Sequence, residues 1–210
     1  MTVPLIVISV IAPRLSQRFG LRVMTVAGLA TIAVGLMLVS RMTVDARYLD
    51  LLWPLLIMSA GLGLCTAPAT YAIIAETPES KHGVAAAVND AAREIGAAMG
   101  IAVAGSVLAA GYTRHIQPAL PQLPEPARGP VSDSLAAALE IAAQAGPMAQ
   151  PLVDYAKEAF VNGSSQATLT LAILTAAAAV LLAILAPGTA PRDHKTTASS
   201  TAPAHRDSVG

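Results

Sequence analysis

No charged residue interrupts the stretch Ile95-Gly-Ala-Ala-Met-Gly-Ile-Ala-Val-Ala-Gly-Ser-Val-Leu-Ala-Ala-Gly-Tyr112. At 1.5 Å per residue, a helix of roughly 18 to 25 such residues covers the ~30 Å hydrocarbon layer of a bilayer. Three further runs without Asp, Glu, Lys or Arg are long enough to do the same: Val23–Ser40, Leu51–Ala75 and Ala167–Ala186. The sequence therefore predicts four complete membrane-spanning helices.

The composition agrees with a bilayer environment. Hydrophobic residues make up 54% of the chain and charged residues 12%, with a mean hydropathy of +0.60. That is about half the charge of an ordinary soluble domain. The net charge is zero and no basic block is present, which argues against a nucleic-acid partner. Lipid is the expected partner. The single cysteine and the unclustered histidines predict neither a disulfide framework nor a metal or cofactor site.

Charge and proline content divide the chain into six segments. We expect residues 1–13 to be the end of an incomplete membrane helix, because their apolar run precedes its arginines and so does not fit a secretory signal. The remaining segments are a cytoplasmic loop (14–22), three membrane helices with short loops (23–112), a long external connection with short helices (113–162), the last membrane helix (163–186) and a disordered cytoplasmic tail (187–210).

The positive charges predict the orientation of these segments. Basic residues gather in the first connection and again in the tail: Arg14, Arg18, Arg22, Arg192, Lys195 and Arg206. Both ends are therefore expected on the cytoplasmic side, and an even number of complete spans between them agrees. The sequence predicts a multi-pass protein of the plasma membrane.

The external connection begins with a proline-rich segment, Pro118–Pro126. Its proline spacing argues against a helix and favours an extended polyproline II path. Ser132–Gln144 is predicted to be a short helix with an Asp or Ser cap, and Pro151–Phe160 another short helix that leads into the last span.

Two segments carry a resemblance to a known family. Pro13-Arg-Leu-Ser-Gln17-Arg18-Phe-Gly20-Leu-Arg22 resembles the cytoplasmic loop signature Gly-x-x-x-Asp-Arg-x-Gly-Arg-Arg of the major facilitator superfamily. Arg18, Gly20 and Arg22 match, whereas Gln17 stands at the Asp position, Pro13 at the first Gly and Leu21 at an Arg. Such a degenerate copy is typical of the second half of these transporters.

The second segment contains Gly61-Leu-Gly63 and Pro68 in one span, then a short turn with Pro78 and Gly83, then Asn89-x-x-x-Arg93-x-x-Gly96-x-x-x-Gly100. It is similar to the late helices of the fourteen-helix drug:proton antiporter branch, and with the long external connection the resemblance covers nearly the whole chain. The resemblance implies an all-α polytopic helix bundle with part of the major facilitator fold. It also implies proton-coupled export of drugs or other small amphipathic molecules, with the missing N-terminal half as a partner.

Small residues predict close helix packing. Ala92, Gly96, Gly100 and Ala104 recur every fourth residue and form one stripe, and Gly61 and Gly63 permit the same on the preceding helix. The stripe is either a sliding surface between transporter elements or, as we favour, a static packing face. Pro68 removes a backbone donor inside a span, so we expect a kink, which serves gating in some transporters and is merely tolerated in others.

Four polar residues precede the charge-free core of their helix: Asn89, Asp90, Arg93 and Glu94. Asp90 and Arg93 are three apart and can pair locally. One interpretation makes this group a cytoplasmic helix end with one solvated side. The other interpretation has Asn89 and Arg93 face a cavity, because an ionisable group at membrane depth requires a partner or water.

None of the four complete spans contains an Asp or Glu. Proton coupling needs a carboxylate with a tuned pKa, so this acid is expected in the absent half unless Asp90 or Glu94 serves. The chain is thus interpreted as the C-terminal fragment of an exporter, inactive alone. The alternative is a non-transporting membrane subunit or interaction module that acts through its external loop. An enzyme is not expected, because no set of nucleophile, base and orienting group is recognisable.

Overall fold

The computed structural model describes residues 20–44 and 46–185, and these contain helices and loops but no strand. The long helices are α2 (Leu21–Val39), α3 (Tyr48–Ala75), α4 (His82–Ile116) and α7 (Gln150–Leu185). Five short helices connect them: η1 (Glu79–Lys81), η2 (Gln117–Gln122), α5 (Glu125–Asp133), α6 (Leu135–Ala145) and η3 (Pro147–Ala149). The predicted all-α fold is confirmed.

Each long helix is apolar and long enough to cross a bilayer, as the charge-free runs predict. α4 has 35 residues and α7 has 36. At 1.5 Å per residue each is about 53 Å long, which exceeds the ~30 Å hydrocarbon layer. Both helices therefore continue beyond the predicted spans. In particular, Pro151–Phe160 is not a separate short helix but the first part of α7.

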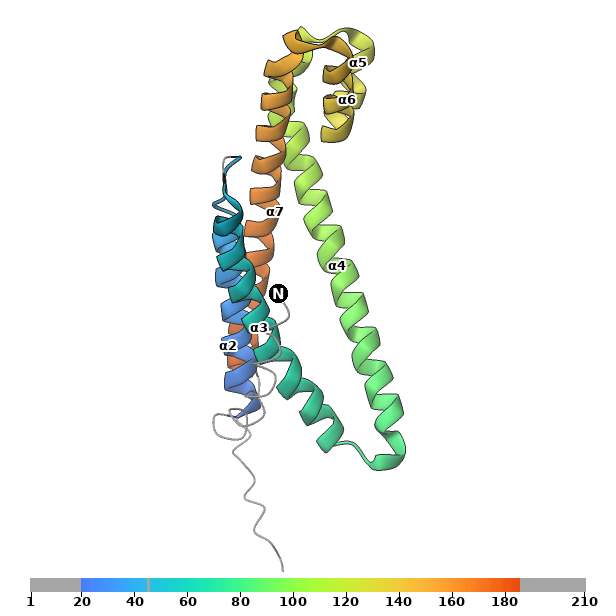
Figure 1. The fold of residues 1–210 in the computed structure, drawn as a ribbon. Coiled ribbons are helices and arrows are strands. Elements are labelled where there is room, and N and C mark those ends of the chain that lie inside the picture. Colours follow the sequence, from blue (N-terminus) through green and yellow to red (C-terminus); the bar gives the residue numbers. More distant parts are fainter. Residues whose placement is uncertain (1–19, 45, 186–210) are drawn as a thin grey trace, which may run out of the picture.

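α2 packs against both α3 and α7 (Figure 1), and we call these three helices the three-helix body. Hydrogen bonds hold α2 to α7 at both ends. The Arg22 guanidinium donates to the Ala183 carbonyl oxygen near the end of α7, and the Ser165 hydroxyl donates to the Ser40 carbonyl oxygen at the other end of α2. These two bonds mark the opposite ends of a body one bilayer thick, because α2 itself has 19 residues.

α2 and α3 approach each other at two glycines. A Cβ on Gly28 would lie 2.8 Å from the Gly61 carbonyl oxygen, and a Cβ on Gly61 would lie 2.7 Å from the Gly28 carbonyl oxygen. Gly63 is also buried. Only residues without a side chain let two backbones meet this closely, which is how membrane helices gain contact area.

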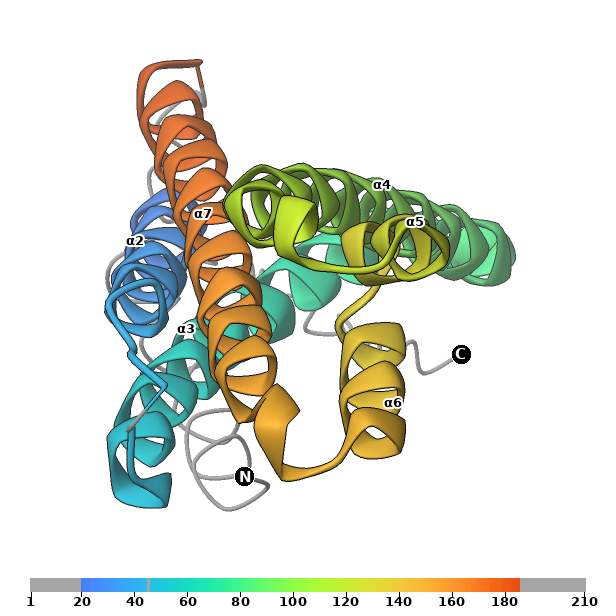
Figure 2. The ribbon, with the colours of Figure 1, turned by 90° about the horizontal axis from the view of Figure 1, so that it is seen from above.

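α4 joins this body only toward one end. A Cβ on Gly163 of α7 would lie 2.8 Å from the Leu108 carbonyl oxygen and 2.9 Å from the Tyr112 nitrogen, and a Cβ on Gly111 would lie 2.7 Å from the Gly163 Cα. From this crossing α4 and α7 diverge toward the bottom of Figure 1, and Figure 2 shows the two helix axes at an angle. We call the end with the crossing the cap end.

η2, α5 and α6 fold over the cap end around a small core of their own (Figure 2). The buried residues of this core are Tyr112, Ile116, Val131, Ala138, Ala156 and Ala159. The Tyr112 hydroxyl donates a 2.9 Å hydrogen bond to the Val131 carbonyl oxygen, which ties α5 to α4. The Ser134 hydroxyl accepts from the Ala136 nitrogen at 3.1 Å, so the predicted helix with a serine cap is confirmed.

The extended path predicted for Pro118–Pro126 is wrong. η2 occupies most of this segment and α5 begins at Glu125, which leaves Leu123 and Pro124 with extended ψ angles of 151° and 143°. Pro118 and Pro126 lie in the first turns of η2 and α5. A proline is tolerated there because the first backbone N–H groups of a helix have no intrahelical acceptor.

Candidate functional site

The predicted polar group occupies the second to fourth turns of α4, far from the cap. Asn89 is half-buried, whereas Asp90, Arg93 and Glu94 are exposed. Asp90 and Arg93, whose spacing permits a local pair, form no salt bridge in the described part of the chain. An exposed pair gains at most about 1 kcal/mol and loses side-chain entropy, so its absence is physically unsurprising.

Asn89 and Arg93 share a face with the small-residue stripe. Arg93 precedes Gly96 by three residues and Gly100 by seven, and Asn89 stands in the same relation to Ala92 and Gly96. Residues with these spacings lie on one side of a helix. We call Asn89, Ala92, Arg93, Gly96, Gly100 and Ala104 the small face of α4.

The small face points to the same side as the crossing with α7. Arg93 precedes Gly111 by five helical turns, about 27 Å along the axis, so the two residues project in the same direction. Gly111 contacts α7. This 27 Å is close to the ~30 Å hydrocarbon thickness, so a bilayer with one boundary at Gly111 has its other boundary near Arg93. The small face therefore borders the angle between α4 and the three-helix body.

At Gly96 and Gly100 no described residue covers the small face, whereas Asn89 and Ala104 are half-buried. A Cβ on Gly96 or Gly100 would meet no atom within 4 Å. The neighbouring Ile95 and Met99 are 62% and 65% exposed. The stripe predicted to pack closely thus has no partner helix in the described part of the chain, in contrast to Gly61. Its packing role stays a prediction that concerns helices other than these.

Pro68 lies within α3, which continues as one helix from Tyr48 to Ala75. The second half of α3 leads away from α2 toward the turn before α4 (Figure 1). In that turn His82 Nε2 lies 2.9 Å from the Thr77 carbonyl oxygen, and the Lys81 nitrogen donates to the Pro78 carbonyl oxygen at 2.8 Å. A gating role for Pro68 stays a prediction.

The loop signature is described only from Gly20 onward, and Gln17 and Arg18 lie outside the described residues. Gly20 has a φ of 81°, which L side chains rarely adopt, so glycine suits this position. Arg22 lies in the first turn of α2, not in the expected loop. Its hydrogen bond to Ala183 was not predicted, although a basic side chain commonly binds carbonyl groups at a helix C-terminus.

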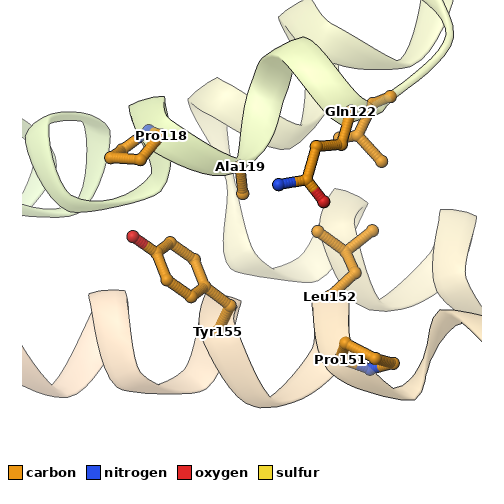
Figure 3. A pocket seen from close by; sticks show the side chains of 7 residues that line it. Pro118, Ala119, Gln122, Pro151, Leu152 and Tyr155 are labelled. Carbon is orange, nitrogen blue, oxygen red and sulfur yellow. The ribbon is translucent and has the colours of Figure 1, made fainter.

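The cap contains a pocket of 280 Å³ between η2 and the start of α7. In Figure 3 the Tyr155 ring points from α7 toward Pro118 and Ala119, and Gln122 and Leu152 lie beside each other. Sequence patterns do not predict this pocket, because its two walls are some 30 residues apart along the chain. Its lining offers apolar contact and an amide, and no group of three potential metal ligands occurs in the described part of the chain.

Two similar proteins have names that refer to multidrug efflux or multidrug resistance. The chain is 28% identical over 188 residues to the multidrug efflux pump LfrA of Mycolicibacterium smegmatis, which covers 87% of this chain and 37% of LfrA. It is 32% identical over 121 residues to the multidrug resistance protein Stp of Mycobacterium tuberculosis, which covers 57% of this chain and 22% of Stp.

The chain therefore spans well under half the length of the curated relatives it matches. No family model matches the sequence, and no solved structure is significantly similar to it. The described residues contain four helices that are long and apolar enough to cross a membrane. Together with the two similar proteins, these helices indicate a multi-pass protein of the plasma membrane that is related to mycobacterial multidrug efflux pumps.

Proposed function

We propose that the chain forms late helices of a proton-coupled exporter of drugs or other small amphipathic molecules, of the fourteen-helix branch of the major facilitator superfamily. The observation that carries this proposal is the similarity to LfrA over 87% of the chain. In this role the chain supplies the C-terminal part of the transporter, and the rest of the transport path comes from other helices.

The open small face of α4 supports a need for further helices. Alternating access requires two sets of helices that move around a central site. Here Gly96 and Gly100 of the small face, which is suited to close helix contact, meet no described residue. The aligned part of LfrA is 37% of its length, so the relative has ample further sequence to supply such helices.

Asn89 and Arg93 are the proposed polar contacts of this chain with the transport path. Both lie on the small face, and Arg93 lies near the boundary of the hydrocarbon layer, where water can reach a charge. The charge-free cores of the four spans contain no carboxylate. Proton binding is therefore assigned to helices outside the described ones, unless Asp90 or Glu94 of α4 serves.

A chimera tests the proposal. The part of LfrA that aligns with this chain is replaced by the chain, and ethidium efflux is measured in cells that lack other efflux pumps. We expect efflux that a protonophore abolishes. No efflux from a chimera that reaches the membrane at the level of LfrA would contradict the proposal.

Arg93→Ala in the active chimera tests the small face. We expect a clear loss of efflux, whereas Arg114→Ala, an exposed arginine at the cap end of the same helix, is the matched control and should retain it. Equal activity of the two variants would show that Arg93 lies at a solvated helix end and has no role in transport.

A non-transporting module that acts through the cap is the second candidate. The cap has a buried core of its own, which favours a defined surface over a loose connection. This candidate predicts an inactive chimera and an intact cap, so the same efflux measurement separates the two functions.

A further inference from the structure

A second surface pocket, of 270 Å³, lies where α2 ends, α3 begins and α7 passes beside them. Its lining contains one cationic residue, Arg47, and the hydroxyl-bearing residues Thr43 and Ser164. Val39, Leu51 and Val161 supply an apolar lining. A pocket lined by a cation, hydroxyl groups and aliphatic residues suits a ligand with an anionic group and a hydrocarbon part.

Arg47 is the charge that this pocket presents. The Asp50 carboxylate accepts a 2.9 Å hydrogen bond from the Arg47 backbone nitrogen, so it caps the start of α3. Among the described residues, the Arg47 side chain has no hydrogen-bond or ion-pair partner. Asp45 lies outside the described residues. A guanidinium offers a planar fork of N–H donors that matches phosphate oxygens.

The pocket lies at the level of a membrane interface. It adjoins the hydrogen bond between Ser165 and Ser40 that marks the end of the three-helix body. At the start of α3, Tyr48 and Trp53 are 78% and 66% exposed, and amphipathic rings settle at the headgroup level of a bilayer. Of the apolar lining residues, Val39 is the last residue of α2 and Leu51 lies in the first turn of α3.

We propose that this pocket binds the phosphodiester headgroup of a membrane phospholipid. The phosphate oxygens accept from Arg47 and from the Thr43 and Ser164 hydroxyls, while the glycerol and first methylene groups cover the apolar lining. Free inorganic phosphate satisfies Arg47 and the hydroxyls but leaves the apolar lining in water. The occupant is therefore a lipid, whose apolar part adds the burial that a free anion lacks.

Lipid titration tests the proposal. The full chain in mild detergent is titrated with phosphatidylglycerol, and the bound lipid is counted by native mass spectrometry. Arg47→Gln should weaken binding about tenfold, the equivalent of one lost charge-assisted hydrogen bond. Arg47→Lys should weaken it less. Ser164→Leu, which fills the pocket from α7, should weaken it without changing Arg47. Arg41→Gln, in the same connection but not in the pocket, is the control and should bind normally.

Circular dichroism and thermal melting check that each variant is folded. Equal lipid binding by the folded wild type and Arg47→Gln would overturn the proposal, as would an equal loss in Arg41→Gln, which would show attraction by charge alone. Displacement of the lipid by excess inorganic phosphate would identify the ligand as a free anion and would also overturn it.

Discussion

Gly111 and Gly163 decide how closely α4 can approach α7. A side chain on Gly163 would point at the backbone of Leu108 and Tyr112, at 2.8 and 2.9 Å, and a backbone cannot rotate away as a flexible side chain can. Gly163→Ala should therefore destabilise the chain in detergent by about 1–3 kcal/mol, the usual cost of overpacking. The measurement is a denaturation curve followed by circular dichroism.

Gly100→Ala is the matched control, at a glycine of α4 that lies outside the crossing with α7. Its Cβ meets open space in this chain, and alanine is the better helix former, so stability should be unchanged or higher. Equal destabilisation by both substitutions would contradict the α4–α7 crossing described above.

The Tyr112 hydroxyl is the second residue-level test, because it joins α4 to α5 through Val131. Tyr112→Phe keeps the buried ring and removes the hydrogen bond, so the Val131 carbonyl loses its side-chain donor. We expect a loss of about 1 kcal/mol and faster hydrogen exchange in α5. Tyr155→Phe is the control, because the Tyr155 hydroxyl has no hydrogen bond to a described residue. Unchanged exchange in α5 of Tyr112→Phe would show that the cap is held otherwise.

Close packing at glycine could be predicted from the sequence only as a tendency. The sequence predicts close helix packing at Gly61, and Gly61 does lie at a backbone contact. Its partner Gly28 is on another helix, however, and no spacing rule links the two glycines. The small face of α4 has the stronger spacing signal, yet its glycines are open. Periodicity identifies a face, whereas the partner of that face depends on tertiary structure.

At the scale of elements, the absence of charge was sufficient to find the spans. α2 runs from Leu21 to Val39, close to the predicted Val23–Ser40. The same signal could not give the ends of α4 and α7, because alanine-rich polar sequence stays helical after it leaves the bilayer. The prediction of an extended path for the proline-rich segment is wrong because proline content alone does not exclude a helix. A proline in the first turn of a helix is tolerated.

The orientation of these elements stays a prediction and can be tested by labelling. Single cysteines are placed at Gln122 in η2 and at Lys81 in η1, both exposed, in a Cys65→Ala background. An impermeant maleimide should label position 122 in intact cells and position 81 only after permeabilisation. The reverse pattern would invert the proposed topology, because α4 lies between the two positions.

At the scale of the whole molecule, the described helices form a body and a diverging arm. Hydrogen bonds tie α2 to α7 at both ends and α3 packs against α2, whereas α4 diverges from α7 beyond the Gly111–Gly163 crossing (Figure 1). The arm carries Arg93 and Asn89 on the side that faces the angle. In the proposed transporter, this arrangement would form one wall of the transport path, and helices outside the described residues would form the opposite wall.

The most direct measurement of this account is ethidium efflux by the 210-residue chain expressed alone, beside the LfrA chimera as a positive control. Four spans cannot enclose a central site on both sides, and their charge-free cores hold no carboxylate to bind the driving proton. We predict that cells with the chain alone retain ethidium like cells without it, while the chimera exports the dye. Export by the chain alone that a protonophore abolishes would contradict the account.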